Sequence, residues 1–386
     1  MAETAVKKKE SVFKRLKNMR LKRGKMDFSI LLTISALCAF GLVMIFSASY
    51  YYAQHYSNIG YDGFYYLKKQ LVYLIIGYPL MLIISVIDYR IIERLRSVFL
   101  AVSILLLIAV LLWGQDLNGG KRWLPVAGIT IQPSELAKFG LMIFMCSYMS
   151  RHRNEMHTFR YGMLPMLIAI GMIAGLVMLQ PNMSMAVIIG FIGVVLLYLG
   201  GCNWKHLVIL GAIGVVGFFF FANMGYRAQR LSSFSNPELD PQGSGYQLLQ
   251  SYYAIGSGGF FGKGLNNSYQ KLLYMTYGES DFIFAILCEE FGFVGGLIVI
   301  VMYALIVFRG MVVAMRCRNR FGSLLAAGIS IVFGFQVFVN IGVVTGLLPT
   351  TGQSLPFISA GGTSLIVFLA AMGLLLSISR DMKPRT

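Results

Sequence analysis

Two carboxylates close the longest polar stretch of this chain, where they are placed for acid–base chemistry. Glu279 and Asp281 end the polar residues 223–281 and directly precede an apolar segment. A connection of this length usually carries function, because a turn needs only a handful of residues. A positioned carboxylate suits the general base of a transfer reaction. We therefore take Asp281 as the candidate catalytic residue.

Cationic side chains occur in the same polar connections. They suit an anionic substrate such as a lipid-linked phosphate, whose charge they would stabilise. The alternative is that they are scattered loop charges with no shared site. The candidates for substrate binding are Lys121, Arg122, Arg227, Arg230 and Lys263.

Ionisable residues inside apolar segments are costly and are functional hypotheses by default. Glu135 and Lys138 lie three residues apart, on one face of a predicted helix, where they can pair. Such a pair either joins two helices or lines a cavity that aligns a charged substrate. Glu289 would lie about 12 Å along a helix from Asp281 and so well inside the membrane, with a structural or a functional role. Glu290 points elsewhere and is expected to pair with a neighbouring helix.

Two glycine-containing segments predict irregular backbone. Residues 352–364 could hold non-helical chain at membrane depth, which is tolerated only where it is buried in protein or lines a cavity. Ser359 within it is a candidate substrate-binding residue. Residues 256–264 form a glycine run without a preceding strand, so a tight re-entrant turn is favoured over a nucleotide loop.

The elements that must position these residues are membrane helices. With 57% hydrophobic and 13% charged residues, the composition argues against a soluble globular domain. We predict an all-α polytopic membrane protein with ten transmembrane helices. The apolar segments are 28–49, 70–87, 98–113, 134–148, 163–179, 183–199, 206–222, 282–308, 322–346 and 363–379.

Basic residues predict the orientation of these segments. Of the 33 Lys and Arg residues, 24 fall in the N-terminal arm, in alternate connections and in the C-terminal tail. The positive-inside rule places that side in the cytoplasm, with both termini there and the long loop outside. We expect a basic arm (1–26), a membrane domain (27–380) and a short tail (381–386). The net charge of +17 then indicates contact with anionic membrane lipids rather than with nucleic acid.

Metal chemistry has little support in the sequence. The five Cys and four His residues show no spacing typical of a metal site. The cysteines are expected to be small packing residues within or near the helices. The sequence shows no complete set of metal ligands. A bound divalent cation (Mg²⁺ or Mn²⁺) could still help to stabilise the phosphate charge of the substrate.

Several sequence blocks, in order, resemble the SEDS family (shape, elongation, division and sporulation), which includes RodA, FtsW and SpoVE. The resemblance covers nearly the whole chain. The blocks are Asn118-Gly-Gly-Lys-Arg-Trp, Gln132-Pro-Ser-Glu-Leu-Ala-Lys, Gln180-Pro-Asn, Gly245-Tyr-Gln-Leu-Leu-Gln-Ser, Gly256-Ser-Gly-Gly, Asp281-Phe-Ile-Phe-Ala, Glu289-Glu-Phe-Gly and Leu355-Pro-Phe-Ile-Ser-Ala-Gly-Gly-Thr-Ser.

The resemblance implies a peptidoglycan glycosyltransferase that polymerises lipid II at the outer face of the cytoplasmic membrane. It implies that Asp281 is the catalytic acidic residue and that Glu135 and Lys138 form the family's ion pair. It also implies a class B penicillin-binding protein (a transpeptidase) as partner, together with other divisome membrane proteins. Residues 344–352 and 230–237 resemble FtsW or SpoVE rather than RodA, and the basic arm suits a cell-division member. The resemblance therefore favours FtsW and division at the septum, with RodA-like elongation and SpoVE-like sporulation as the alternatives.

The chain departs from the family pattern at several positions. Asn182 stands where an acidic residue is usual, and Thr276 and Tyr277 replace a usual Pro-Glu pair before the catalytic position. Ala360 occupies a position that is often Tyr. Glu279 is expected to substitute for the missing acidic group. Two other functions are weighed against the enzyme: a lipid II flippase that uses the Glu135–Lys138 cavity, and a non-catalytic divisome scaffold.

Overall fold

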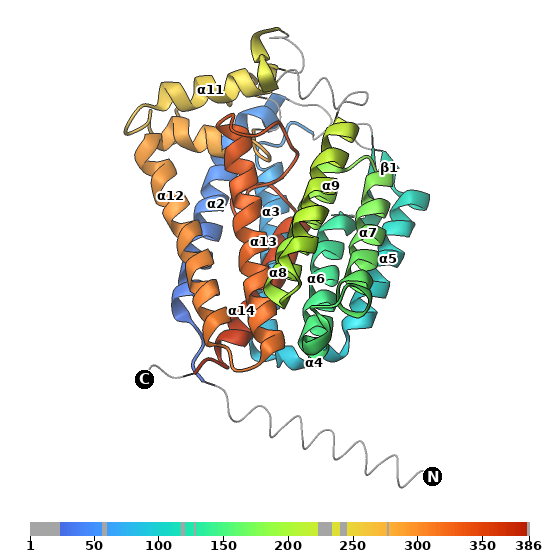
Figure 1. The fold of residues 1–386 in the computed structure, drawn as a ribbon. Coiled ribbons are helices and arrows are strands. Elements are labelled where there is room, and N and C mark those ends of the chain that lie inside the picture. Colours follow the sequence, from blue (N-terminus) through green and yellow to red (C-terminus); the bar gives the residue numbers. More distant parts are fainter. Residues whose placement is uncertain are drawn as a thin grey trace.

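Ten long helices form the body of the part of the chain that the structure describes (Figure 1). This structure is a computed structural model, and it describes residues 24–55, 60–116, 120–126, 129–222, 234–239, 245–275 and 278–383. The long helices are α2 (Phe28–His55), α3 (Tyr65–Val86), α5 (Arg96–Trp113), α6 (Pro133–Arg151), α7 (Leu164–Leu179), α8 (Met183–Gly200), α9 (Trp204–Ala222), α12 (Ile283–Arg316), α13 (Arg320–Val344) and α14 (Thr363–Ser379).

Each of the ten predicted apolar segments corresponds to one of these helices. Seven helices of the described residues are long and apolar enough to cross a membrane: α2, α3, α5, η3 with α7, α8, α12 and α13. Two shorter apolar helices cover Trp204–Gly217 and Thr363–Ser379. Exposed Leu, Ile, Val and Phe side chains on α3, α5 and α12 suit contact with lipid rather than water. The chain is a polytopic helical membrane protein, as predicted.

Shorter elements join these helices. Near one end are α4 (Tyr89–Arg94), η2 (Arg153–Glu155) and η3 (Phe159–Met163); the long polar stretch contains η4 (Pro237–Leu239) and α11 (Tyr246–Gly258). Three antiparallel strands, β1 (Gln115–Asp116), β2 (Lys121–Val126) and β3 (Ile129–Ile131), form a small sheet in the order β1-β2-β3. The prediction of a purely helical protein missed this sheet, because its strands are too short for a clear alternation of apolar and polar residues.

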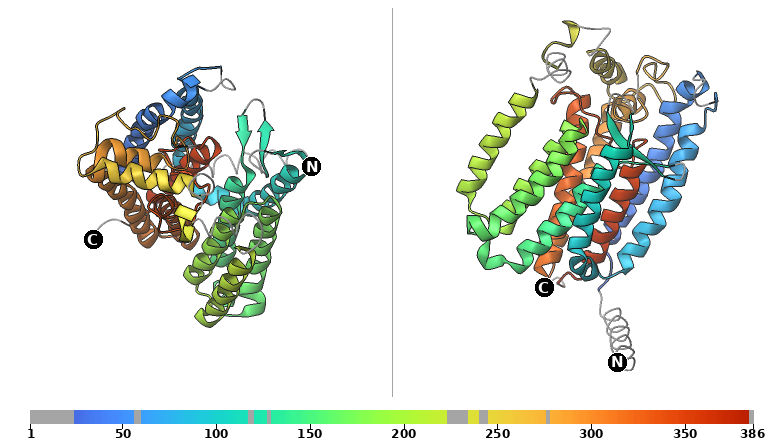
Figure 2. Two further views of the ribbon diagram at one scale, coloured as in Figure 1. Left: turned by 90° about the horizontal axis from the view of Figure 1, so that it is seen from above. Right: turned by 90° about the vertical axis from the view of Figure 1, so that its right-hand side faces the viewer.

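The described chain begins and ends at the same end of the molecule. Gly24 donates its main-chain N–H to the oxygen of Arg380 at 2.9 Å, and Lys383 donates to Arg316 at 3.1 Å. Asp381 forms an ion pair with Arg90 at 2.8 Å. The small sheet and α11 lie at the opposite end (Figures 1 and 2). Basic residues of the connections, among them Arg90, Arg151 and Arg316, lie at this first end.

Helix α3 packs closely on α14. A Cβ atom added to Gly77 would stand 2.8 Å from Leu369, and one added to Gly373 would stand 2.6 Å from the main-chain oxygen of Met81. Small residues at such positions let two membrane helices approach each other. This contact places the N-terminal part of α3 beside residues 351–362, which lead into α14.

Helix α12 is broken at Gly292, contrary to the single span predicted over 282–308. Gly292 has φ 66° and ψ −166°, which is not helical. The turn after α11 supplies replacement hydrogen bonds: Lys263 N–H donates to Glu289 O at 3.0 Å, and Phe293 N–H donates to Gly259 O at 2.9 Å. Gly259, Gly262 and Gly264 have positive φ, which confirms the predicted tight turn.

Candidate functional site

Asp281 lies in the turn just before α12, where α13 holds its main chain. Asn340 Nδ2 on α13 donates to Asp281 O at 2.8 Å and to Gln353 O at 2.7 Å. The Asp281 side chain is half-buried. A Cβ atom on Gly352 would stand 3.4 Å from Asp281 Oδ2, so the carboxylate faces the irregular segment 351–362. This segment follows the prediction for residues 352–364 of non-helical chain packed within protein.

Glu279 lies on the same turn and is buried. Its main-chain oxygen accepts a hydrogen bond from Ala360 N–H at 3.0 Å. Its carboxyl accepts a hydrogen bond from the Tyr66 hydroxyl of α3. Burial raises the pKa of the Glu279 carboxyl above its ordinary value because desolvation disfavours the charged form, although hydrogen bonds to the carboxyl from its own main-chain N–H and from Tyr66 oppose the rise. Glu279, predicted to substitute for the family's missing acidic group, is therefore close to Asp281 in sequence. Its carboxyl, however, is hydrogen-bonded to Tyr66 of α3.

Glu135 and Lys138 pair at the start of α6, as predicted. Lys138 Nζ lies 2.8 Å from Glu135 Oε2, and both side chains are almost completely buried. Lys138 Nζ also donates to Gln336 Oε1 at 2.8 Å, and its ammonium lies 4.7 Å from the centre of the Phe368 ring. Glu135 Oε2 has the distance of an ion pair but makes no hydrogen bond of good geometry among the described residues. The pair joins α6 to α13 in this structure.

One face of α13 connects this ion pair to Asp281. Gln336 Nε2 donates to Ser354 O at 3.1 Å, next to the bond from Asn340 to Gln353. Gln336 and Asn340 are four residues apart, about 6 Å along the helix and on the same face. Two amides of α13 therefore hold residues 353–354, with Lys138 bound to one amide and the main chain of Asp281 bound to the other.

Arg122 on β2 binds main-chain oxygens at the turn between α7 and α8. Its Nε donates to Gln180 O at 3.3 Å and its NH2 group to Pro181 O at 2.5 Å. Asn182, in the same turn, caps α8 by accepting from Met185 N–H at 3.3 Å. The neighbouring Lys121 is exposed. The turn itself was predicted, whereas the contact with Arg122 was not.

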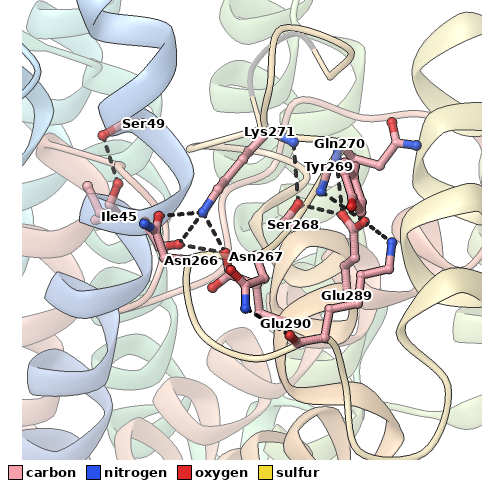
Figure 3. Close-up of polar contacts among 12 residues, drawn as sticks. Ile45, Ser49, Asn266, Asn267, Ser268, Tyr269, Gln270, Lys271, Glu289 and Glu290 are labelled. Atoms are coloured by element: carbon pink, nitrogen blue, oxygen red, sulfur yellow. Dashed lines mark hydrogen bonds and ion pairs between the residues drawn. The ribbon is translucent and has the colours of Figure 1, made fainter.

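Glu289 is surrounded by the glycine turn and the residues that follow it (Figure 3). Lys263 Nζ lies 2.7 Å from Glu289 Oε1. The carboxylate also accepts from the Ser268 hydroxyl and from the main-chain N–H groups of Tyr269 and Gln270. Residues 283–291 form a continuous helix, as the predicted separation of about 12 Å from Asp281 requires. The break at Gly292 separates this stretch from the rest of α12, and the loop covers the Glu289 carboxylate.

Glu290 pairs with a different lysine and with α2. Lys271 Nζ lies 2.9 Å from Glu290 Oε1 and 2.6 Å from Asn266 Oδ1, and the hydroxyl of Ser47 donates to Glu290 Oε1 at 2.6 Å. Figure 3 shows how the loop carries Lys271 towards α2. The contact with Ser47 confirms the expectation that Glu290 pairs with a neighbouring helix.

Among the remaining candidate residues, Ser359 has a structural contact and several others lie outside the described chain. The Ser359 hydroxyl accepts from Leu355 N–H at 2.8 Å, so Ser359 stabilises the turn 355–359. Four parts of the predicted set lie outside the described residues: Arg227, Arg230, residues 1–23 of the basic arm, and the Pro-Glu position at Thr276 and Tyr277. Within those residues, no group of three or more His, Cys, Asp or Glu side chains is placed to hold a metal ion.

Sequence reasoning missed Gln336 and Asn340. Both are buried amides in an otherwise apolar helix. Their spacing of four residues could have indicated a polar helix face, because polar side chains inside membrane helices usually have partners.

Comparisons with known proteins identify the family of this chain. Residues 28–384 match the family described as "Cell cycle protein", the family of FtsW, RodA and SpoVE. The chain is 38% identical to a probable peptidoglycan glycosyltransferase FtsW of Trichlorobacter lovleyi, over 92% of this chain and 94% of the relative. It is 36% identical to stage V sporulation protein E of Bacillus subtilis, over 94% of this chain and 99% of the relative.

Solved structures give the same relationship. A chain from a structure described as "Structural coordination of polymerization and crosslinking by a peptidoglycan synthase complex" superposes with a TM-score of 0.75 at 30% identity, covering 92% of this chain and 98% of that one. RodA of Thermus thermophilus superposes with a TM-score of 0.68 at 28% identity, covering 93% and 98%. Since both sequence and fold match over nearly their whole length, the chain belongs to the FtsW/RodA/SpoVE family of bacterial membrane proteins.

Proposed function

We propose that this chain is a peptidoglycan glycosyltransferase that polymerises lipid II into glycan strands, with Asp281 as the general base. The observation that carries the proposal is the placement of Asp281: it is half-buried, its main chain is held by Asn340, and its carboxylate faces Gly352. The reaction class comes from the relatives, which are named probable peptidoglycan glycosyltransferases.

The proposed reaction is a single displacement with inversion. The Asp281 carboxylate takes the proton of the acceptor sugar's 4-hydroxyl as that oxygen bonds to the anomeric carbon of the lipid-linked donor. The bond from this carbon to undecaprenyl pyrophosphate breaks, and its electron pair leaves with the pyrophosphate. An α-linked donor thereby gives a β-linked strand. Arg122, Lys121, Lys138, Arg227 and Arg230 are the candidate cations for the leaving group.

We propose ten membrane crossings, both termini in the cytoplasm, and Asp281 at the outer face. The contacts of Gly24 with Arg380 and of Asp381 with Arg90 support a shared end for the two termini. That end carries the basic connections, which suits the cytoplasmic side. The sheet, α11 and the turn with Asp281 then face outwards, where lipid II is polymerised.

We also propose a class B penicillin-binding protein as partner and a role in division at the septum. The first structural neighbour belongs to a peptidoglycan synthase complex that coordinates polymerization and crosslinking, which supports a transpeptidase partner. Residues 344–352 and 230–237 resemble FtsW or SpoVE rather than RodA, which supports a role other than elongation, and the basic arm suits a division protein. No step is assigned to a divalent cation, because the described residues offer it no cluster of ligands.

The test is lipid II polymerisation in detergent by the full chain with its cognate transpeptidase. Asp281→Asn should lower the rate at least about a hundredfold, the usual contribution of a general base. Asp62→Asn, at an acidic residue paired with Lys68 near the same end, is the matched control and should retain activity. Detergent removes the two compartments that a flippase needs, so product made by the wild type excludes a flippase or scaffold alone. Equal product from Asp281→Asn would remove Asp281 as the base.

A further inference from the structure

A cavity of about 110 Å³ lies beside the turn that carries Glu279 and Asp281. One face of α3 forms a wall of it, since its lining residues Tyr66, Lys69, Gln70 and Tyr73 follow the i, i+3, i+4, i+7 spacing of a helix face. Trp123 on β2 lines the cavity from the sheet. Residues 360–362 complete it. We call this cavity the α3 pocket.

The floor of the α3 pocket is built from residues with little or no side chain. Ala360, Gly361 and Gly362 line it. A Cβ atom added to Gly362 would stand 3.1 Å from Cζ of Tyr73, which also lines the pocket. A side chain at this position would therefore fill part of the space between residues 360–362 and α3.

The polar contacts of its lining hold the α3 pocket in shape. The Tyr66 hydroxyl donates to the buried Glu279 carboxyl, which fixes the direction of the ring. Gln70 Nε2 donates to Ser359 O at 3.3 Å. Ala360 lines the pocket and also donates its N–H to Glu279 O at 3.0 Å. The pocket therefore shares a wall with the turn that holds the candidate base.

Three aromatic rings, one ammonium and one amide suit a saccharide ring. Tyr and Trp present apolar faces on which the C–H faces of a pyranose can pack, while their polar ends form hydrogen bonds, as the Tyr66 hydroxyl does with Glu279. Lys69 is the one cation among the described lining residues, and the neighbouring Lys68 is paired with Asp62 at 2.8 Å. The described lining offers this one exposed ammonium and no arginine, so it lacks the several charge-assisted donors that usually bind a phosphate, and its aromatic faces favour an uncharged ring.

We propose that the α3 pocket binds one uncharged N-acetylated hexosamine ring of the glycan, as a subsite beside the reacting centre. The identity of the sugar rests on the proposed function, whereas the pocket itself rests on its geometry. Bound there, a sugar ring would hold the strand next to the turn of Asp281. Blocking the α3 pocket should therefore weaken binding of the growing glycan strand and shorten the glycan products.

The direct test uses the fluorescence of Trp123 with a tetramer of N-acetylglucosamine as the probe. Replacing the exposed Trp113 and Trp204 by Phe leaves Trp123 as the only tryptophan of the 3 in the chain. Ala360→Leu, which puts an isobutyl group into the pocket, should weaken saturable binding at least tenfold. Lys69→Ala should weaken it about fivefold, the loss of one ordinary hydrogen bond.

The matched control is Ala101→Leu, the same change at an exposed position of α5, and its affinity should stay within twofold of the parent. Because the readout is binding, it separates this proposal from the proposed function. Saturable binding that Ala360→Leu weakens supports the pocket even if Asp281→Asn polymerises normally. An unchanged emission of Trp123 in folded protein, or equal binding by Ala360→Leu, would overturn the proposal.

Discussion

Asn340 joins the candidate base to the segment that faces it: its Nδ2 lies 2.8 Å from Asp281 O and 2.7 Å from Gln353 O. Replacing it with Leu leaves two buried carbonyl oxygens without this donor, so the free energy of unfolding should fall by about 1–3 kcal/mol. The turn with Asp281 should lose its position, and the rate of lipid II polymerisation should fall more than tenfold. Thermal unfolding and the detergent assay measure both effects.

Thr345→Val is the control for Asn340→Leu. The Thr345 hydroxyl bonds only within its own helix, to Ile341 O at 2.8 Å and Gly342 O at 3.5 Å among the described contacts. This variant should keep both stability and activity. Wild-type activity in Asn340→Leu would show that the turn holds its position without α13.

Arg122 provides the second prediction, because its guanidinium binds two carbonyl oxygens at once. Lys keeps the charge but cannot reproduce a forked contact. Arg122→Lys should therefore lower both the unfolding temperature and the polymerisation rate. Arg160→Lys, at an exposed arginine, should change neither. If Arg122→Lys is as stable and active as the wild type, the charge alone matters.

Glu279 should make stability depend on pH. Its pKa is higher in the folded protein than the ordinary value of 4.5. The folded state therefore binds this proton more tightly than the unfolded state, and stability falls as pH rises from about 4.5 through the folded pKa. Glu279→Gln should flatten this part of the curve of unfolding temperature against pH. A curve identical to that of the wild type would contradict the prediction.

Gly292 should tolerate no side chain. A Cβ atom there would stand 2.4 Å from Gly262 N and 2.5 Å from Phe260 O, at φ +66°. Gly292→Ala should destabilise the protein by more than the roughly 1–3 kcal/mol of backbone strain alone. Gly171→Ala is the control, because a Cβ atom on Gly171 of α7 meets nothing within 4 Å. Equal unfolding temperatures for the two variants would mean that the break at Gly292 can close.

The long helices and the place of Asp281 could be predicted because both depend on local sequence. Apolar runs of this length have few stable forms other than membrane helices. The pairing of Glu135 with Lys138 also follows from local spacing, as the 2.8 Å distance confirms. The partners of Glu289 and Glu290 are different. Lys263 and Lys271 precede them by 26 and 19 residues, a separation that leaves no periodic pattern.

The break in α12 could not be predicted for the same reason. Residues 282–308 form one apolar run, and nothing local distinguishes Gly292 from a helical glycine. The hydrogen bonds that replace the helical ones come from Gly259, Lys263 and Gly264 of the preceding turn. The prediction of one straight helix over 282–308 was therefore wrong at Gly292, where contacts with the preceding turn replace the helical hydrogen bonds.

The buried pair of Lys271 and Glu290 carries the last prediction. The two side chains lie 2.9 Å apart with almost no exposure. Lys271→Met alone should cost about 3–5 kcal/mol, because it leaves a buried carboxylate without its cation. Adding Glu290→Met should recover much of this loss, since the double variant buries no charge. The exposed Lys68, paired with Asp62, gives the control: Lys68→Met should leave the unfolding temperature close to that of the wild type. Additive losses of stability in the double variant would contradict this prediction and would mean that each side chain stabilises α2 and the loop separately. If the double variant recovers stability but not polymerisation, the pair would instead serve to position the turn of Asp281.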